Sequence, residues 1–121
     1  MNNEISLGTW LSLYSEAIAE VLVNAGYEWV TVDLEHSTIT IDQAEKLIRV
    51  IDLAGAKPYV RVSSNDAVQI KRVLDAGAQG IIVPMVNTKD DVIAAISAMN
   101  YPPLGSRGMG LARAQGYGQA N

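Results

Sequence analysis

The chain has 121 residues, about the length of one modest domain. Hydrophobic residues make up 49% of it and charged residues 18%, so it can build a core and is not intrinsically disordered. The formal net charge of −4 argues against a sequence-independent nucleic-acid binder, and the absence of cysteine excludes disulfides, thiolate zinc sites and a cysteine nucleophile.

Apolar runs along the chain are short. None approaches the ~18 uninterrupted apolar residues of a membrane span, and the first seven residues contain Glu4 and no basic residue. We therefore expect a cytoplasmic protein with no membrane partner.

Strand-like and helix-like segments alternate through residue 99. In chain order we predict a strand at Ser6–Leu11, a helix at Ser15–Ala25, a strand at Trp29–Asp33, a helix from the capping box at Thr40 to Gly55, a strand at Pro58–Val62, a helix from Asn65 or Asp66 to Gly77, a strand at Gly80–Pro84 and a helix from Thr88 to Met99.

An Ala-Gly dipeptide recurs at three of the joins from helix to strand, at Gly26, Gly55 and Gly77. Glycine adopts the left-handed conformation that ends a helix, so each dipeptide predicts a short return to the next strand. Strands alternating with helices in this way indicate parallel β-α-β units with right-handed crossovers.

The chain changes character after residue 100. The segment from Tyr101 to Gly110 is rich in proline and glycine, and nothing up to Asn121 resembles a closing element or a capping helix. We predict an α/β fold made of the first half of a TIM (β/α)₈ barrel, truncated after about four βα units, because a full barrel needs ~250 residues. A half-barrel of this kind is a fragment, or it completes itself by association. The rival interpretation is a small open parallel sheet.

Three ionisable residues lie at the carboxyl end of the predicted strand at Trp29–Asp33. They are Asp33, Glu35 and the only histidine, His36. The carboxyl ends of parallel strands are where α/β folds place their chemistry, and a carboxylate beside an imidazole favours a general base. The alternative is a histidine satisfied by its acidic neighbours at a strand end.

Arg61 lies in the next strand, between two valines. A buried guanidinium needs a partner, so we expect either a structural pair with Asp33 or Glu35, or a stabiliser of a developing enolate or carboxylate. Trp10, at the end of the first strand, is placed equally well to line a pocket or to pack in the core.

The glycine-rich segment at residues 105–110 has the wrong spacing for a dinucleotide fingerprint and follows a helix where that motif follows a strand. Its amides and Arg107 suit an anion cradle. A flexible loop is the commoner explanation, and we favour it.

Several of these motifs, taken together and in order, resemble the HpcH/HpaI aldolase family, which includes 2-dehydro-3-deoxyglucarate aldolase and 4-hydroxy-2-oxoheptanedioate aldolase. The resemblance covers nearly the whole chain. It rests on Gly8-Thr9-Trp10, Asp33-Leu34-Glu35-His36, Val60-Arg61-Val62, Asn65-Asp66-Ala67-Val68-Gln69-Ile70-Lys71, Leu74-Asp75-Ala76-Gly77, Val83-Pro84-Met85-Val86, Tyr101-Pro102-Pro103 and Arg107-Gly108-Met109-Gly110.

The resemblance implies a metal-dependent pyruvate aldolase on a TIM barrel. It assigns His36 as the base, Arg61 as the stabiliser of the pyruvate enolate and Asp75 as the residue that raises the basicity of the histidine. Geometry alone favours Asp33 or Glu35 as that partner, because Asp75 lies near the end of a helix that runs back to the opposite face.

The family's divalent metal is magnesium, manganese or cobalt, held by a glutamate and an aspartate on the fifth and sixth strands. Residues 1–121 thus form the N-terminal half of the barrel domain, without the metal-binding half. We expect no metal ligand in this chain and no activity from it alone.

The expected reaction of the full-length protein is reversible cleavage of a 4-hydroxy-2-oxo acid to pyruvate and an aldehyde. Its expected partners are these small molecules and further copies of itself in a homo-oligomer, with no nucleic acid. One alternative is a metal-independent carbon–carbon bond-forming synthase of the same fold. Another is a non-catalytic half-barrel that acts through association.

Overall fold

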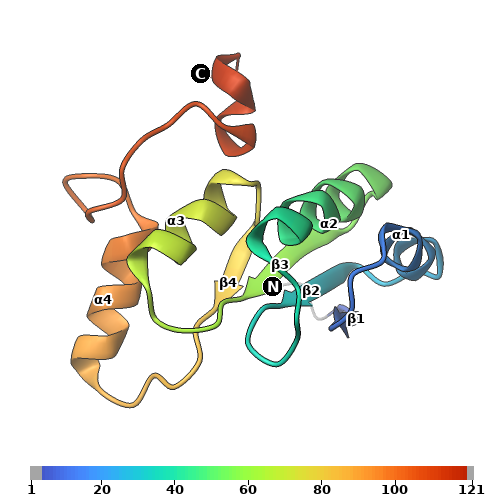
Figure 1. The fold of residues 1–121 in the computed structure, drawn as a ribbon, viewed down its shortest axis with the longest axis horizontal. Helices are drawn as coiled ribbons and strands as arrows, with labels where there is room; N and C mark the ends of the chain where they lie inside the picture. Colours follow the sequence, from blue (N-terminus) through green and yellow to red (C-terminus); the bar gives the residue numbers. More distant parts are fainter. Residues whose placement is uncertain (1–3, 120–121) are drawn as a thin grey trace.

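The computed structural model describes residues 4–119 and contains a repeated strand–helix pattern (Figure 1). These described residues form four strands and four α-helices, followed by one short 3₁₀-helix. In order they are β1 (Gly8–Leu11), α1 (Glu16–Asn24), β2 (Trp29–Asp33), α2 (Ile41–Ala54), β3 (Lys57–Arg61), α3 (Ala67–Asp75), β4 (Gly80–Ile82), α4 (Lys89–Met99) and η1 (Arg113–Gly118).

The four strands form one sheet in the order β1-β2-β3-β4, and every neighbouring pair is parallel. The helices lie on one side of this sheet, with α1 and α4 at its two ends and α2 and α3 between them (Figure 1). This arrangement confirms the predicted α/β class with four parallel βα units. It also sends the carboxyl ends of all four strands in one direction, which defines the mouth of a half-barrel.

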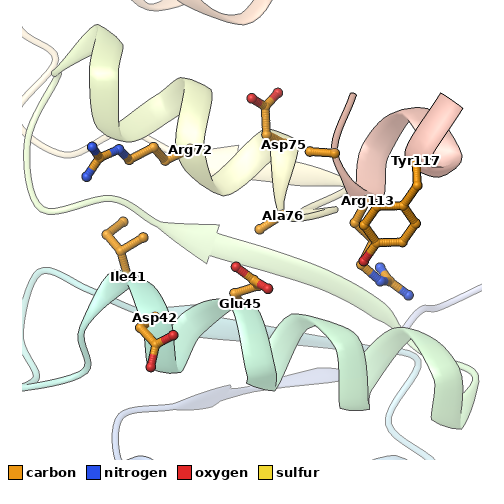
Figure 2. Close-up of a pocket in the computed structure, with 9 residues that line it drawn as sticks. Ile41, Asp42, Glu45, Arg72, Asp75, Ala76, Arg113 and Tyr117 are labelled. Carbon is orange, nitrogen blue, oxygen red and sulfur yellow. The ribbon is translucent and has the colours of Figure 1, made fainter. Parts of the chain in front are cut away.

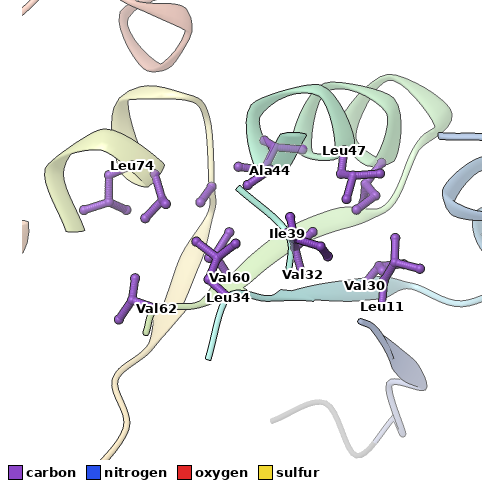
Figure 3. Packing of buried hydrophobic residues seen from close by; sticks show 14 of the residues in the cluster. Leu11, Val30, Val32, Leu34, Ile39, Ala44, Leu47, Val60, Val62 and Leu74 are labelled. Atoms are coloured by element: carbon purple, nitrogen blue, oxygen red, sulfur yellow. The ribbon is translucent and has the colours of Figure 1, made fainter. Parts of the chain in front are cut away.

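The hydrophobic core lies between the sheet and the helical layer (Figure 3). Alternate residues of the central strands point into it, because side chains of a strand alternate between faces. Each fully buried large aliphatic side chain contributes roughly 1.5–3 kcal/mol. The largest of these with almost no exposure are Val30, Val32, Val60, Val62, Leu47, Ile48, Ile51, Ile70 and Val73.

Local signals set the helix boundaries. The N-cap side chains accept hydrogen bonds from the first turn of each helix, and Thr40 and Thr88 complete capping boxes. Asp66, not Asn65, caps α3. The three predicted glycines after α1, α2 and α3 have φ of 108°, 110° and 110°, which confirms the left-handed turn at each join.

Two strands are shorter than predicted. The predicted strand at Gly80–Pro84 ends at Ile82, because Pro84 has no backbone N–H to donate and Met85 turns the chain with a φ of 57°. The predicted strand at Ser6–Leu11 pairs only from Gly8, although the Leu7 carbonyl still accepts a hydrogen bond from the Glu28 amide at 2.8 Å.

The tail contains one element that was not predicted, the 3₁₀-helix η1. Residues 105–110 form neither helix nor strand, as predicted, but η1 follows them. Two arginines anchor this tail to the helices. Arg107 donates to Asp75 at 2.7 Å, and Arg113 donates to Asp52 at 2.6 Å.

No helix of the described residues lies on the second face of the sheet. Trp29, Tyr59 and Ile82 contribute to this face, and glycines make room for the large rings. A Cβ on Gly8 would lie 1.8 Å from the Trp29 ring, so only glycine fits opposite that indole in the β1–β2 register. Among residues 4–119, no helix is both long enough and apolar enough to cross a bilayer.

Candidate active site

The mouth of the half-barrel is organised by an ion pair between the last residues of β2 and β3. Asp33 and Arg61 are direct neighbours in the strand register. The Arg61 Nε donates to Asp33 Oδ1 at 2.9 Å and its Nη2 donates to Oδ2 at 2.7 Å. This two-point contact fixes the plane of the guanidinium. The Asp33 side chain is 5% exposed and that of Arg61 24%, so the carboxylate is buried while the guanidinium still reaches solvent.

Asp33 also shapes the turn that follows β2. Its Oδ1 accepts hydrogen bonds from the backbone amides of Glu35 at 2.9 Å and His36 at 3.3 Å. Its carbonyl oxygen accepts a further hydrogen bond from the Ser37 hydroxyl. The hydrogen bond from Arg61, helped by the two amides, lowers the pKa of Asp33 to about 2 against the opposing effect of burial. Asp33 is therefore ionised at neutral pH, and it holds both Arg61 and the turn after β2.

Glu35 lies between the histidine and the arginine. Its Oε1 is 3.4 Å from His36 Nε2 and 3.3 Å from Arg61 Nε. The imidazole is 73% exposed, whereas the Glu35 side chain is only 19% exposed. Of the two nearby carboxylates predicted as partners of His36, Glu35 lies beside the ring and Asp33 binds only the backbone amide.

Trp10 forms one wall of the mouth. The central carbon of the Arg61 guanidinium lies 4.6 Å from the centroid of the Trp10 ring, a cation–π distance. The hydrogen bond from Arg61 to Asp33 raises the pKa of Arg61. Within the described residues, no hydrogen bond engages Arg61 Nη1. The mouth thus combines an exposed imidazole, a fixed cation with free donors and an aromatic wall.

Asp75 is placed elsewhere. It ends α3, which starts near the mouth and runs antiparallel to the strands, so nine residues of helix carry it about 13 Å towards the opposite end of the sheet. There its Oδ1 accepts the hydrogen bond from Arg107. The structure brings together His36, Arg61 and Trp10, and it does not bring Asp75 to them within one chain.

A groove of about 630 Å³ lies on the helical layer away from this mouth (Figure 2). It runs between α2 and α3 and is bordered by η1. Asp75, Arg113 and Tyr117 lie at one end of it, and Ile41 and Asp42 at the other. Since no strand end contributes to its lining, this groove is separate from the candidate active site.

No local pattern along the chain indicates the contacts that hold the tail. The partners of Arg107 and Arg113 lie 32 and 61 residues away, beyond any local pattern. The contact of Arg61 with Trp10 is of the same kind, because it depends on β1 lying beside β2 and on the reach of two side chains across the sheet.

The residues at the mouth do not complete a cation site. Both carboxylate oxygens of Asp33 accept hydrogen bonds from Arg61. The remaining side chains there that could act as metal ligands are those of Glu35 and His36. In the part of the chain that the structure describes, no group of three or more His, Asp or Glu side chains is placed to hold a metal ion.

Comparison with known proteins relates this geometry to a family. The family model described as HpcH/HpaI aldolase/citrate lyase matches residues 6–118. A relative from Pseudomonas putida, 2-dehydro-3,6-dideoxy-6-sulfogluconate aldolase, is 43% identical over 113 residues, which are 93% of this chain and 44% of that protein.

Solved structures give the same relationship. A family protein from Burkholderia cenocepacia J2315 superposes with a TM-score of 0.89 at 36% identity, over 94% of this chain and 47% of that one. A citrate synthase superposes with a TM-score of 0.82 at 35% identity, over 86% of this chain and 42% of that one. The chain spans about half the length of the relatives it matches, and its fold corresponds to half of a TIM barrel.

Proposed function

Because the chain belongs to the HpcH/HpaI aldolase/citrate lyase family, we propose that a complete barrel containing it cleaves a 4-hydroxy-2-oxo acid reversibly to pyruvate and an aldehyde. The substrate named for the Pseudomonas putida relative is an acid of this class, since its 2-dehydro, 3-deoxy name places an oxo group at C2 and keeps the hydroxyl at C4. The observation that carries the proposal is that Glu35 Oε1 lies 3.4 Å from the exposed His36 imidazole and 3.3 Å from the fixed Arg61 guanidinium, which brings both groups to one carboxylate.

His36 is the proposed proton carrier. In the cleavage direction its imidazole accepts the proton of the C4 hydroxyl, directly or through a water molecule. The C3–C4 bond then breaks, C4 leaves as the aldehyde, and the electron pair passes into the enolate of pyruvate. The imidazolium returns the proton to C3 and yields pyruvate. Glu35, 3.4 Å from the ring, stabilises the imidazolium that forms in between.

Arg61 is the proposed stabiliser of the enolate. Asp33 holds its Nε and Nη2, and Trp10 covers one face of the guanidinium, which leaves Nη1 to donate to the enolate oxygen or to the substrate carboxylate. A donor held in place before the charge develops costs no reorganisation and contributes on the order of 10²–10³ in rate.

A divalent cation (magnesium, manganese or cobalt) is part of the proposal for the complete barrel. Such an ion would polarise the substrate carbonyl. Because the described residues of this half place no three His, Asp or Glu side chains together to hold an ion, we propose that the ligands of the ion lie outside this chain. We accordingly expect the 121-residue chain to be inactive alone.

Asp75 remains a prediction that rests on the family resemblance. Within one chain its carboxylate is held by Arg107 at the far end of α3. Its proposed support of His36 is therefore tested separately, against a variant that removes the same ion pair.

A chimera tests the proposed activity. The matched half of the Pseudomonas putida aldolase is replaced by this chain, and pyruvate release from a 4-hydroxy-2-oxo acid is measured with a coupled dehydrogenase. We expect cleavage that a chelator abolishes. Arg61→Ala should lower turnover by a factor on the order of 10²–10³, and His36→Ala by a factor on the order of 10²–10⁴. A folded, active chimera that keeps full turnover in both variants would contradict the assigned roles.

The structural similarity to a citrate synthase favours one second candidate, a carbon–carbon bond-forming synthase. The same chimera and a chelator distinguish the two. Condensation without added metal, together with no cleavage of 4-hydroxy-2-oxo acids, would support the synthase and exclude the aldolase.

A further inference from the structure

We propose that Gln69, on the first turn of α3, is a positioning residue that fixes the end of β3 and thereby keeps Arg61 in place for the reaction. This inference deepens the proposed function and rests on it. The Gln69 side chain reaches back across the loop between β3 and α3 to Ser63, which lies two residues after Arg61. The Ser63 backbone N–H donates to Gln69 Oε1 at 2.6 Å, and Gln69 Nε2 donates to the Ser63 hydroxyl at 2.9 Å.

Gln69 departs from the capping pattern of α2 and α4. In α2, Gln43 at the third helical position accepts a hydrogen bond from the N-cap amide of Thr40 at 3.1 Å, and α4 has the same arrangement. Gln69 occupies the third position of α3, but its side chain passes the N-cap Asp66 and bonds Ser63, three residues further back. Helix capping therefore does not account for this contact.

The contact lies where β4 stops holding the chain. The Arg61 carbonyl accepts a hydrogen bond from the Leu34 amide at 2.9 Å, and the Val62 amide donates to the Ile82 carbonyl at 3.1 Å. In a parallel ladder the next bond from β4 would come from the N–H of residue 84, and Pro84 has none. The side-chain amide of the glutamine provides the next hydrogen bonds along the chain.

The position of Arg61 depends on two supports. Asp33 fixes the tip of the guanidinium through Nε and Nη2, whereas the end of β3 fixes the Cα atom. Asp33 also holds the turn after β2, by accepting the amides of Glu35 and His36, and Gln69 holds the turn after β3 in the same manner. Release of that turn lets the end of β3 shift, and Nη1 shifts with it. A displacement of about 1 Å can cost on the order of 10² in rate.

Turnover of the chimera with the Pseudomonas putida aldolase tests this role. Gln69→Met keeps the length and the helix preference of the side chain but removes its hydrogen bonds, and we expect turnover to fall by a factor on the order of 10–10². Gln69→Glu should recover most of the loss, because its carboxylate still accepts the Ser63 N–H. Gln43→Met is the matched control, since it removes an ordinary cap contact at the same position of α2, and it should leave turnover unchanged.

A double-mutant cycle shows whether the effect passes through the arginine. In an Arg61→Ala background, Gln69→Met should cause no further loss of turnover. An equal second loss, no recovery by Gln69→Glu, or full turnover of Gln69→Met in an active chimera would overturn this inference alone. A folded wild-type chimera without cleavage would overturn the proposed function as well. Gln69→Lys, which also forms helix well and accepts no hydrogen bond, gives the same test if Gln69→Met fails to fold.

Discussion

Arginine–aspartate pairs stabilise both ends of the half-barrel, but they leave different groups free. At the mouth, Asp33 is buried while Arg61 stays 24% exposed, with an exposed histidine beside it. At the other end, Arg107 is only 9% exposed; it bonds Asp75 and lies 4.6 Å from the centroid of the Tyr101 ring. One pair presents a cation to solvent, and the other encloses it.

The difference shows that residue type alone does not identify a catalytic arginine. Arg61 and Arg107 both bond an aspartate at 2.7 Å, and both lie against an aromatic ring at 4.6 Å. The two arginines differ in exposure. The guanidinium of Arg61 reaches solvent at the strand ends, whereas that of Arg107 is enclosed. Variants at the two ends should therefore separate activity from stability.

Removal of Arg107 should have the largest effect on stability. Arg107→Met breaks a largely buried ion pair and a ring contact, and we expect a loss of about 3 kcal/mol in the free energy of unfolding, measured with urea. Turnover of the folded chimera should stay unchanged, because Arg107 lies at the end opposite the mouth.

Asp75→Asn is the matched partner of that variant, because it removes the same ion pair from the other side. The proposed support of His36 by Asp75 predicts a fall in turnover, and a changed pH profile, that Arg107→Met does not share. Equal turnover in the two variants would leave Asp75 with a structural role only.

Acid should weaken the pair of Asp33 and Arg61 at the mouth. The expected loss of folding free energy is slightly smaller than that for Arg107→Met. The pKa of Asp33 is lowered from 3.8 to about 2 in the folded chain, so the folded state binds this proton less readily than the unfolded state. The stabilisation is complete above the unfolded pKa and is lost as the pH falls from about 4 to about 2. It amounts to about 2 kcal/mol.

Urea unfolding of the wild type and of Asp33→Asn across this pH range measures the effect. The difference in stability between them should shrink as the pH falls. A difference that is constant down to about pH 2 would contradict the ionised Asp33.

Removal of Arg113 should have the smallest effect. Its pair with Asp52 is partly solvated, with side chains 17% and 34% exposed, so Arg113→Met should cost up to about 1 kcal/mol. The loss should disappear in high salt, unlike that of Arg107→Met. A cost equal to that of Arg107→Met would mean that burial does not separate the two tail anchors.

Most of the fold was predictable because its signals are local. Thr40 with Gln43, and Thr88 with Asp91, begin helices through contacts three residues apart, and Gly55 ends one by its own backbone freedom. The regular alternation of these units then indicates a parallel sheet. The short η1 was missed because it has no apolar periodicity and no side-chain cap.

The candidate site was predictable in part. His36 and Arg61 follow from their positions at strand ends, and the pairing of Asp33 with Arg61 was one of two expectations for that arginine. Cytoplasmic location, homo-oligomer formation and the catalytic roles remain predictions. The position of Glu35 between imidazole and guanidinium required the structure, because it depends on the turn that Asp33 holds.

The sequence by itself determined the βα units, their family and the residues at the mouth, since these depend on spacing along the chain. Only the tertiary structure decided which charges pair. It placed Asp75 with Arg107, and among the described residues it gave Arg61 Nη1 no hydrogen-bond partner, because pairing depends on which helix and strand ends meet in space. It also showed that the described residues form a sheet with one face covered by helices.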